Sequence, residues 1–452
     1  MAAAISCNFL NQLSFLTNPK RLRKTAELNL PALQQLAGNL GHSNYVTFQL
    51  RGLLFLACAS ILPASYGRTL TPAWIELGAG RRAIVRIVMD EPNQCPAAII
   101  DGASHPMSLR QPVPQGFKPA CEIDVPANAK SASVNGQKLK LPRADPTRIV
   151  VLGDTGCRVN ANQTQACNDP AQWPLQRIAT RAASDGPSLV IHVGDYLYRE
   201  GKCTTPQTCG TTTPGDNWEA WSADFFTPAA KLLAAAPWAF SRGNHEICQR
   251  SWRGWFYYLD PTPWRNSCDV FPPPYLVTLG HFELLMLDSS GASDRADKKQ
   301  IDIYAAQLAS IHATNAWLVD HHPLWALRAP LKSGPPERSA TNMAEAWDKA
   351  APQGIKLIVS GHTHLFELLS FDQNHPPQLV AGDGATALAD PIPENLDHTK
   401  VSGATIADGV SRHEFGYTLM NKTSTGWTIL LKSPLKSTIL TCRIDGVQTH
   451  CH

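Results

Sequence analysis

The segment RIVVLGDTG, residues 148–156, decides the fold class, because a continuous apolar run ends directly in a Gly-Asp pair. A second segment, LVIHVGDYLY at 189–198, repeats this pattern. Continuous apolar runs of this length are typical of strands buried on both faces. Strands that alternate with helices predict an α/β domain, in which polar residues at the strand ends gather along one edge of the sheet. Helical patterns separate the apolar runs at 173–183, 220–235, 301–311 and 342–350.

The polar residues that follow the apolar runs form five short motifs. A glycine before a ligand lets the backbone turn sharply and approach a bound ion. Carboxylate and imidazole groups supply the mixed oxygen and nitrogen donors that first-row transition metals accept. One carboxylate can also bridge two ions, which then lie about 3.5–4 Å apart and hold a phosphoryl group from both sides. In chain order the motifs are GDTG (153–156), GDYLY (194–198), GNHE (243–246), VDHH (319–322) and GHTH (361–364).

Each motif alone is a weak signal, but the ordered set resembles the calcineurin-like metallophosphoesterases and, within them, the purple acid phosphatases. The resemblance covers residues from about 147 to 420. The wider superfamily usually has Asp-x-His in the first motif, whereas Gly156 stands at the histidine position here. Tyr198 lies where the purple group has its metal-binding tyrosinate. A phenolate is a hard anionic ligand that favours Fe(III). The missing histidine and the additional tyrosine are therefore both consistent with an Fe(III) site.

This resemblance implies a two-sheet αββα sandwich with helices outside, and two metal ions. Fe(III) is expected at the Tyr198 site, with Fe, Zn or Mn at the second site. His245 is expected beside the substrate phosphate, where it protonates the leaving group. Glu246 is a candidate to orient His245 or to support the ligands from behind. His321 is a candidate for the same supporting role, and a packing or surface position is the alternative that the sequence favours for it. The implied ligands are Asp154, Tyr198 and His364 for the first ion, Asp195 as the bridge, and Asn244, His322 and His362 for the second ion.

The implied activity is hydrolysis of phosphate monoesters by a metal-bound hydroxide, with a small-molecule phosphoester as substrate. An alternative within the superfamily is a divalent-metal phosphodiesterase or nucleotidase in which Tyr198 binds no metal. A non-catalytic binding module is disfavoured, because decay of an active site usually deletes ligands and every motif position is filled. The sequence leaves a redox side activity open.

Two further segments precede the catalytic domain, which we place at 147–452 and expect to end in β-hairpins. Residues 68–146 alternate short β-like runs with turn signals, such as AIVRIV at 83–88, and predict a small all-β domain. Within 1–67, the stretch RGLLFLACASILPASYG at 51–67 has a basic residue, an apolar run and a small-residue exit. That layout is typical of a secretory signal, so 1–67 is expected to be a leader.

Cysteine usage predicts an oxidising compartment. The chain has 12 cysteines, and those that follow the leader fall into pairs that close short local loops. Such loops suit disulfides, which persist outside the cytoplasm. Together with the leader, this predicts a secreted or periplasmic protein. The close neighbours are Cys157/Cys167, Cys203/Cys209, Cys248/Cys268 and Cys442/Cys451; Cys95 and Cys121 remain as a fifth candidate pair, and the sequence leaves the connectivity open.

Composition excludes several other classes. Of 452 residues, 43% are hydrophobic and 17% are charged, which excludes a disordered or fibrous chain. The net charge of +3 arises from residues 1–59, which carry +4, so the remainder is slightly acidic and nucleic-acid binding is not expected from charge. No run of 18 apolar residues occurs, so no transmembrane segment is expected.

Overall fold

The computed structural model describes residues 69–451 apart from 92–94, 331–332, 340–341, 373–374 and 436. The expected leader, 1–67, lies outside the described residues. Among the residues that are described, no helix is long and apolar enough to cross a membrane.

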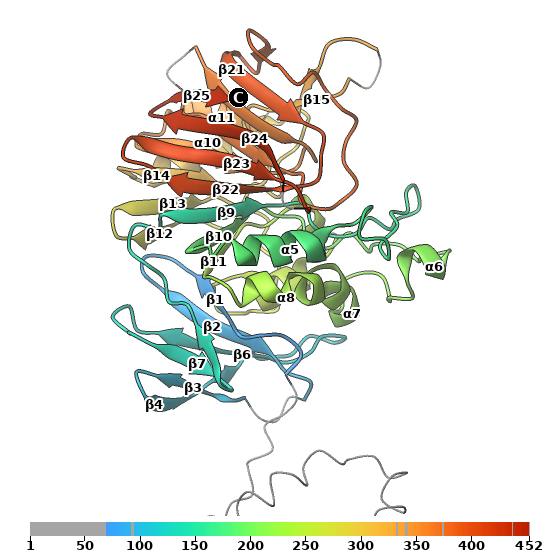
Figure 1. Ribbon diagram of the computed structural model, residues 1–452, viewed down its shortest axis with the longest axis vertical. Helices are drawn as coiled ribbons and strands as arrows, with labels where there is room; N and C mark the ends of the chain where they lie inside the picture. Colours follow the sequence, from blue (N-terminus) through green and yellow to red (C-terminus); the bar gives the residue numbers. More distant parts are fainter. Residues whose placement is uncertain are drawn as a thin grey trace, which may run out of the picture. The chain divides into compact units, whose positions relative to one another are not determined.

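Two large sheets form the scaffold (Figure 1). The first has the order β25 (Gln448–Cys451), β24 (Thr438–Asp445), β23 (Gly426–Lys432), β22 (Tyr417–Lys422), β9 (Arg148–Leu152), β10 (Leu189–His192), β11 (Trp238–Phe240), β1 (Trp74–Leu77), β2 (Ala83–Val88), β6 (Ala120–Val125) and β5 (Ser108–Leu109). The second has the order β12 (Tyr275–Leu279), β13 (Phe282–Met286), β14 (Ala316–Val319), β17 (Ile355–Ser360), β19 (Gln378–Ala381), β18 (Phe366–Phe371), β21 (Ala404–Arg412) and β20 (Lys400–Val401).

Smaller elements complete the described chain. A four-stranded sheet has the order β4 (Ala103–Pro106), β3 (Ala97–Ile100), β7 (Ala132–Val134) and β8 (Gln137–Leu139), and a two-stranded sheet pairs β15 (Leu327–Arg328) with β16 (Glu337–Arg338). The α-helices are α5 (Leu175–Ser184), α6 (Pro206–Cys209), α7 (Trp218–Trp221), α8 (Thr227–Leu233), α9 (Trp252–Gly254), α10 (Lys298–Ser310) and α11 (Asn342–Ala350). Two π-helical turns, η2 (Ser222–Phe226) and η4 (Trp255–Leu259), and a 3₁₀ turn, η3 (Asn244–Glu246), connect them.

The alternation of side chains along β9 explains why its sequence is apolar throughout. Ile149 and Val151 join the core between the two sheets, whereas Val150 and Leu152 join a second core under helices α5 and α8. Successive residues of a strand point to opposite faces, so a strand covered on both faces needs a continuous apolar run. Helices α10 and α11 cover the outer face of the second sheet in the same way. The structure therefore confirms the predicted αββα sandwich.

The strands that precede residue 147 divide between two sheets. β1, β2, β6 and β5 extend the first large sheet, because β1 pairs in parallel with β11 through Glu76 and Trp238. The other four form the separate four-stranded sheet. The region is a small β region, as expected, and the boundaries 68–146 and 147–452 stay predictions.

A buried charge network attaches these early strands to the segment after α9. Arg86 on β2 lies 2.6 Å from the Glu76 carboxylate and 2.8 Å from Glu122, and Arg86 and Glu76 are both fully buried. Its guanidinium also donates to the carbonyl of Tyr258 at 2.6 Å, and Arg110 donates to that of Phe256 at 3.0 Å. Because both carbonyls belong to η4, the network fixes the loop that follows the GNHE motif.

The substitution Arg86→Met tests this network. It leaves the Glu76 carboxylate buried without its cation, so we expect the free energy of unfolding to fall by about 3–5 kcal/mol. Lys298→Met is the control, because the Lys298–Asp302 pair is exposed on α10 and its loss should cost about 0–1 kcal/mol. Chemical denaturation measures both; equal losses would show that the buried network contributes no more than a surface pair.

The structure joins all five candidate cysteine pairs as disulfides. Three of them close loops that begin within five residues after the first three motifs, and the others lie in the early strands and the C-terminal hairpin. The pairs are Cys95–Cys121, Cys157–Cys167, Cys203–Cys209, Cys248–Cys268 and Cys442–Cys451.

Candidate metal centre

The five motifs meet at one edge of the sandwich, at the carboxyl ends of parallel strands. β9, β10 and β11 run parallel in the first sheet, and β14 and β17 run parallel in the second. Several motif residues other than glycine adopt left-handed backbone conformations, with φ of 53° at Asp154, 62° at Asp195, 74° at His362 and 53° at His364. Such conformations cost free energy and cluster at functional sites, so these four residues are candidates for a binding site.

One cluster joins the first, second and fifth motifs. Candidate ligand atoms of Asp154, Asp195 and His364 all lie within 4.8 Å of one another. The phenolic oxygen of Tyr198 lies 2.6 Å from Asp195 Oδ2, 3.0 Å from His364 Nε2 and 3.3 Å from Asp154 Oδ1. Burial, followed by the charges of Asp195 and Asp154, raises the pKa of the Tyr198 phenol well above its usual range. A phenolate here therefore requires a strong neighbouring cation.

A second cluster joins the third, fourth and fifth motifs. Ligand atoms of His321, His322 and His362 lie within 4.8 Å of one another. The side-chain oxygen of Asn244 lies 2.9 Å from His321 Nε2 and 3.0 Å from His362 Nδ1. Asp195 Oδ2 is 3.5 Å from His321 Nε2, so the Asp195 carboxylate faces both clusters, as expected for a bridging ligand.

Within VDHH, the sequence interpretation made His322 the ligand and gave His321 a supporting role. The structure shows His321 Nδ1 at 2.8 Å from the carbonyl of Val193, which can only accept, so Nδ1 carries a proton. The other nitrogen, Nε2, points at the oxygens of Asn244 and Asp195, the arrangement typical of a metal-binding histidine. These contacts favour His321 as a ligand. His322 stays in the group, and its Nδ1 is buried without a hydrogen-bond partner among the described residues.

The donor set fits metal ions on its own chemistry. The lone pair of His321 Nε2 faces two oxygen acceptors, a contact that is repulsive unless a proton or a cation lies between them. Burial lowers the pKa of His321, but the Asp195 carboxylate opposes this and raises it to about 10. Carboxylate, phenol, amide and imidazole donors together suit two first-row transition metals.

Glu246, expected behind the ligands, holds two motifs together. Its carboxylate accepts backbone N–H groups from Asp195 (3.1 Å), Tyr196 (2.9 Å), Leu197 (3.2 Å) and Gly243 (3.1 Å). Burial raises the pKa of Glu246 to about 8, and the N–H donors oppose this shift by favouring the charged form. This carboxylate therefore fixes the backbone of GDYLY and GNHE relative to each other.

His245 lies beside the clusters, and sequence analysis missed the residue that contacts it. Its ring packs 3.7 Å from the Tyr198 ring between centroids, and its Nδ1 lies 3.0 Å from Oε1 of Glu200. Glu200 follows the GDYLY motif by two residues, and that proximity was the available signal. Its Oε1 is also 3.5 Å from Arg250 Nε.

Residues 147–366, which contain all five motifs, match the family model for calcineurin-like phosphoesterases. The chain carries a calcineurin-like phosphoesterase domain. The family is one of metallophosphoesterases, so this domain implies hydrolysis of phosphoric esters. No curated protein matches the chain by sequence.

Two solved structures share the fold of this phosphoesterase. The purple acid phosphatase from yellow lupin (Lupinus luteus) seeds is 12% identical, with a TM-score of 0.50 over 84% of this chain and 73% of that chain. PhoD is 11% identical, with a TM-score of 0.53 over 87% of this chain and 93% of that chain. At these identities the similarity concerns the fold.

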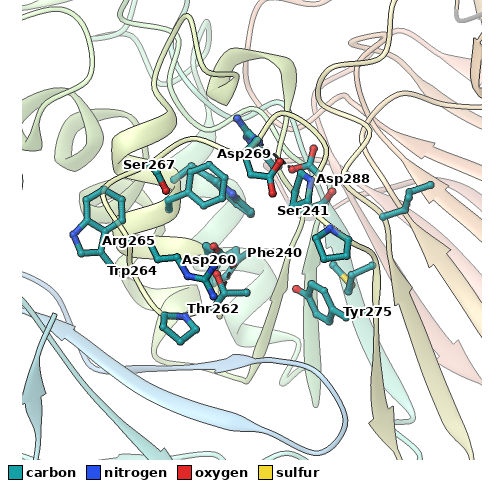
Figure 2. A pocket seen from close by; sticks show the side chains of 18 residues that line it. Phe240, Ser241, Asp260, Thr262, Trp264, Arg265, Ser267, Asp269, Tyr275 and Asp288 are labelled. Atoms are coloured by element: carbon teal, nitrogen blue, oxygen red, sulfur yellow. Dashed lines mark hydrogen bonds and ion pairs between the residues drawn. The ribbon is translucent and has the colours of Figure 1, made fainter. Parts of the chain in front are cut away.

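A cavity of about 260 Å³ lies outside the two candidate metal-binding clusters. Figure 2 shows Trp264 and Tyr275 on opposite sides of this cavity, with Asp260 between them in the view. It borders the GNHE motif through Arg242, but no residue of either cluster lines it.

The role of Glu246 is tested by Glu246→Gln. Glutamine offers one acceptor oxygen, and its NH₂ group faces backbone donors, so we expect a loss of about 1–3 kcal/mol of stability and a lower metal content. Thermal unfolding and elemental analysis read both effects. Glu345→Gln, at an exposed position of α11, is the matched control. Unchanged stability and metal content in Glu246→Gln would refute the organising role.

Single substitutions distinguish which of the two adjacent histidines binds metal. We expect His321→Ala to reduce bound metal to about one ion per chain, because Nε2 faces Asn244 and Asp195, and His322→Ala to keep more of it. Elemental analysis of the purified variants measures this directly. The opposite ranking would restore His322 as the ligand of the VDHH motif.

Proposed function

We propose that this chain is a binuclear phosphomonoesterase of the purple acid phosphatase type. The position of the Tyr198 phenol carries the proposal, because it lies among Asp154, Asp195 and His364 at 2.6–3.3 Å. A phenolate at this position is a hard anionic ligand, and such ligands favour Fe(III) over divalent ions.

The proposed ligands follow the two clusters. Asp154, Tyr198 and His364 would hold Fe(III), and Asp195 would bridge to a second ion, which is Fe, Zn or Mn. Asn244, His321 and His362 would hold that second ion, with His322 beside them. When bound, the two ions supply Lewis acidity that polarises a phosphoryl oxygen and acidifies water.

His245 is the proposed proton donor to the departing alkoxide. Contact with Glu200 at Nδ1 and packing against Tyr198 restrict the ring, and Nε2 lies 4.0 Å from Asp195 Oδ2. The edge of the ring that carries Nε2 therefore faces the bridging carboxylate. A proton held there is placed for general-acid catalysis.

The proposed compartment is the periplasm or the extracellular space. Five disulfides support it, because such bonds persist where thiols are not kept reduced.

Metal analysis combined with a visible spectrum tests the proposed function. We expect two metal ions per chain including iron, a visible absorption band, and hydrolysis of p-nitrophenyl phosphate that a chelator abolishes. Tyr198→Phe should remove the band, because the phenolate–Fe(III) unit produces it.

Tyr196→Phe is the matched control for this experiment. Tyr196 belongs to the same motif, but its hydroxyl donates to the carbonyl of Ser241 at 2.8 Å and its ring stacks on His192. Removal of this hydroxyl in Tyr196→Phe should leave the visible absorption band unchanged. Two divalent ions without a visible band would instead favour the phosphodiesterase or nucleotidase alternative and return Tyr198 to packing.

A further inference from the structure

We propose that Arg158 binds the second negative charge of a phosphate monoester and so selects monoesters over diesters. The inference rests on the proposed function and names the residue that sets its substrate class. Arg158 lies next to the GDTG motif, two residues after Gly156.

The guanidinium of Arg158 lies against two residues of the first metal cluster. Its Nη2 is 3.2 Å from Nδ1 and 3.3 Å from Nε2 of His364. Nearly equal distances place Nη2 over the imidazole face, so it does not occupy the in-plane lone pair of either nitrogen. The guanidinium carbon also lies 5.0 Å from the centre of the Tyr198 ring. The cation therefore lies at the edge of the proposed Fe(III) site without displacing a ligand.

The charge of Arg158 has no carboxylate partner within ion-pair distance among the described residues. Its Nε is buried and makes no hydrogen bond to the described part of the chain. Arg199, in the next motif region, shows the usual arrangement, because it pairs with Asp224 at 2.7 Å. Arg158 is half-buried, so its guanidinium is only partly solvated, and an anion that meets it would gain charge-assisted hydrogen bonds. Arg158 thus has donors available for a ligand.

The backbone on both sides of Arg158 is held in place. The Cys157–Cys167 disulfide closes the loop next to it. Its N–H donates to Gln165 Oε1 at 3.0 Å, and its carbonyl accepts from the Gln165 N–H at 2.7 Å. Gln165, which is buried, also donates to the carbonyl of Ala385 at 2.8 Å. A guanidinium on such a fixed base loses little entropy when it binds.

The chemistry of the two ester classes explains the selection. A phosphate monoester is largely a dianion at neutral pH, since its second pKa is about 6, whereas a diester keeps a single negative charge. A planar guanidinium can donate to two phosphoryl oxygens at once and gains most from the dianion. In a diester one of those oxygens is alkylated and loses both charge and acceptor strength.

The test compares two substrates in Arg158→Met and Arg158→Lys. We expect Arg158→Met to lower kcat/KM for p-nitrophenyl phosphate at least about tenfold, and that for bis(p-nitrophenyl) phosphate by less than about threefold. Arg158→Lys should recover part of the loss, because it restores charge without the planar fork. Inorganic phosphate binding, measured by calorimetry, should weaken in parallel with the monoester loss.

Controls separate the inference from the proposed function. Arg412→Met removes a cation that already pairs with Glu394 at 3.2 Å. It should leave kcat/KM unchanged for both esters. Equal losses for both esters, or loss of metal in Arg158→Met, would show that Arg158 only supports His364 and would overturn the inference. If the unaltered protein hydrolyses neither ester, the proposed function fails. In that case the affinity for inorganic phosphate tests Arg158 by itself. An affinity in Arg158→Met equal to that of the unaltered protein would overturn the role of Arg158.

Discussion

The carboxylate of Glu246 is the interaction on which the catalytic edge depends. It gathers backbone N–H groups from two motifs that are about fifty residues apart, and so fixes the turn that presents Asp195. The approach is so close that a Cβ on Gly243 would lie 2.0 Å from Asp195 Oδ1, which only glycine avoids. Because Asp195 faces both clusters, displacement of this turn would separate the two halves of the centre.

The cation requirement of the centre follows from the same geometry. Asp154, Asp195 and Tyr198 place anionic or acceptor groups around one small volume, and His321 directs a lone pair toward two oxygens. In a metal-free chain, protons must supply the missing positive charge, so metal binding releases protons. Arg158 contributes positive charge from the outside, where it can meet substrate instead of replacing a metal ion.

Residue periodicity and spacing predicted the features that neighbouring residues in the chain determine. The apolar runs of β9 and β10, the helix at 342–350 and the disulfides follow from periodicity and spacing, and the motif order indicated the metal centre. Two adjacent histidines after a strand cannot be ranked this way, because a shift of one residue exchanges the faces they occupy. The parallel pairing of β1 with β11 and the contact of Glu200 with His245 depend on tertiary packing, which spacing does not encode.

Three crosslinks follow three consecutive metal-site motifs: Cys157–Cys167 after GDTG, Cys203–Cys209 after GDYLY and Cys248–Cys268 after GNHE. Exposed loops are the usual sites of proteolytic cleavage. A single protease cut between the paired cysteines would leave both chain ends covalently joined next to the motif they follow. A chain break inside one of these three loops would therefore leave the loop attached, whereas the same break in a loop without a disulfide would release its ends.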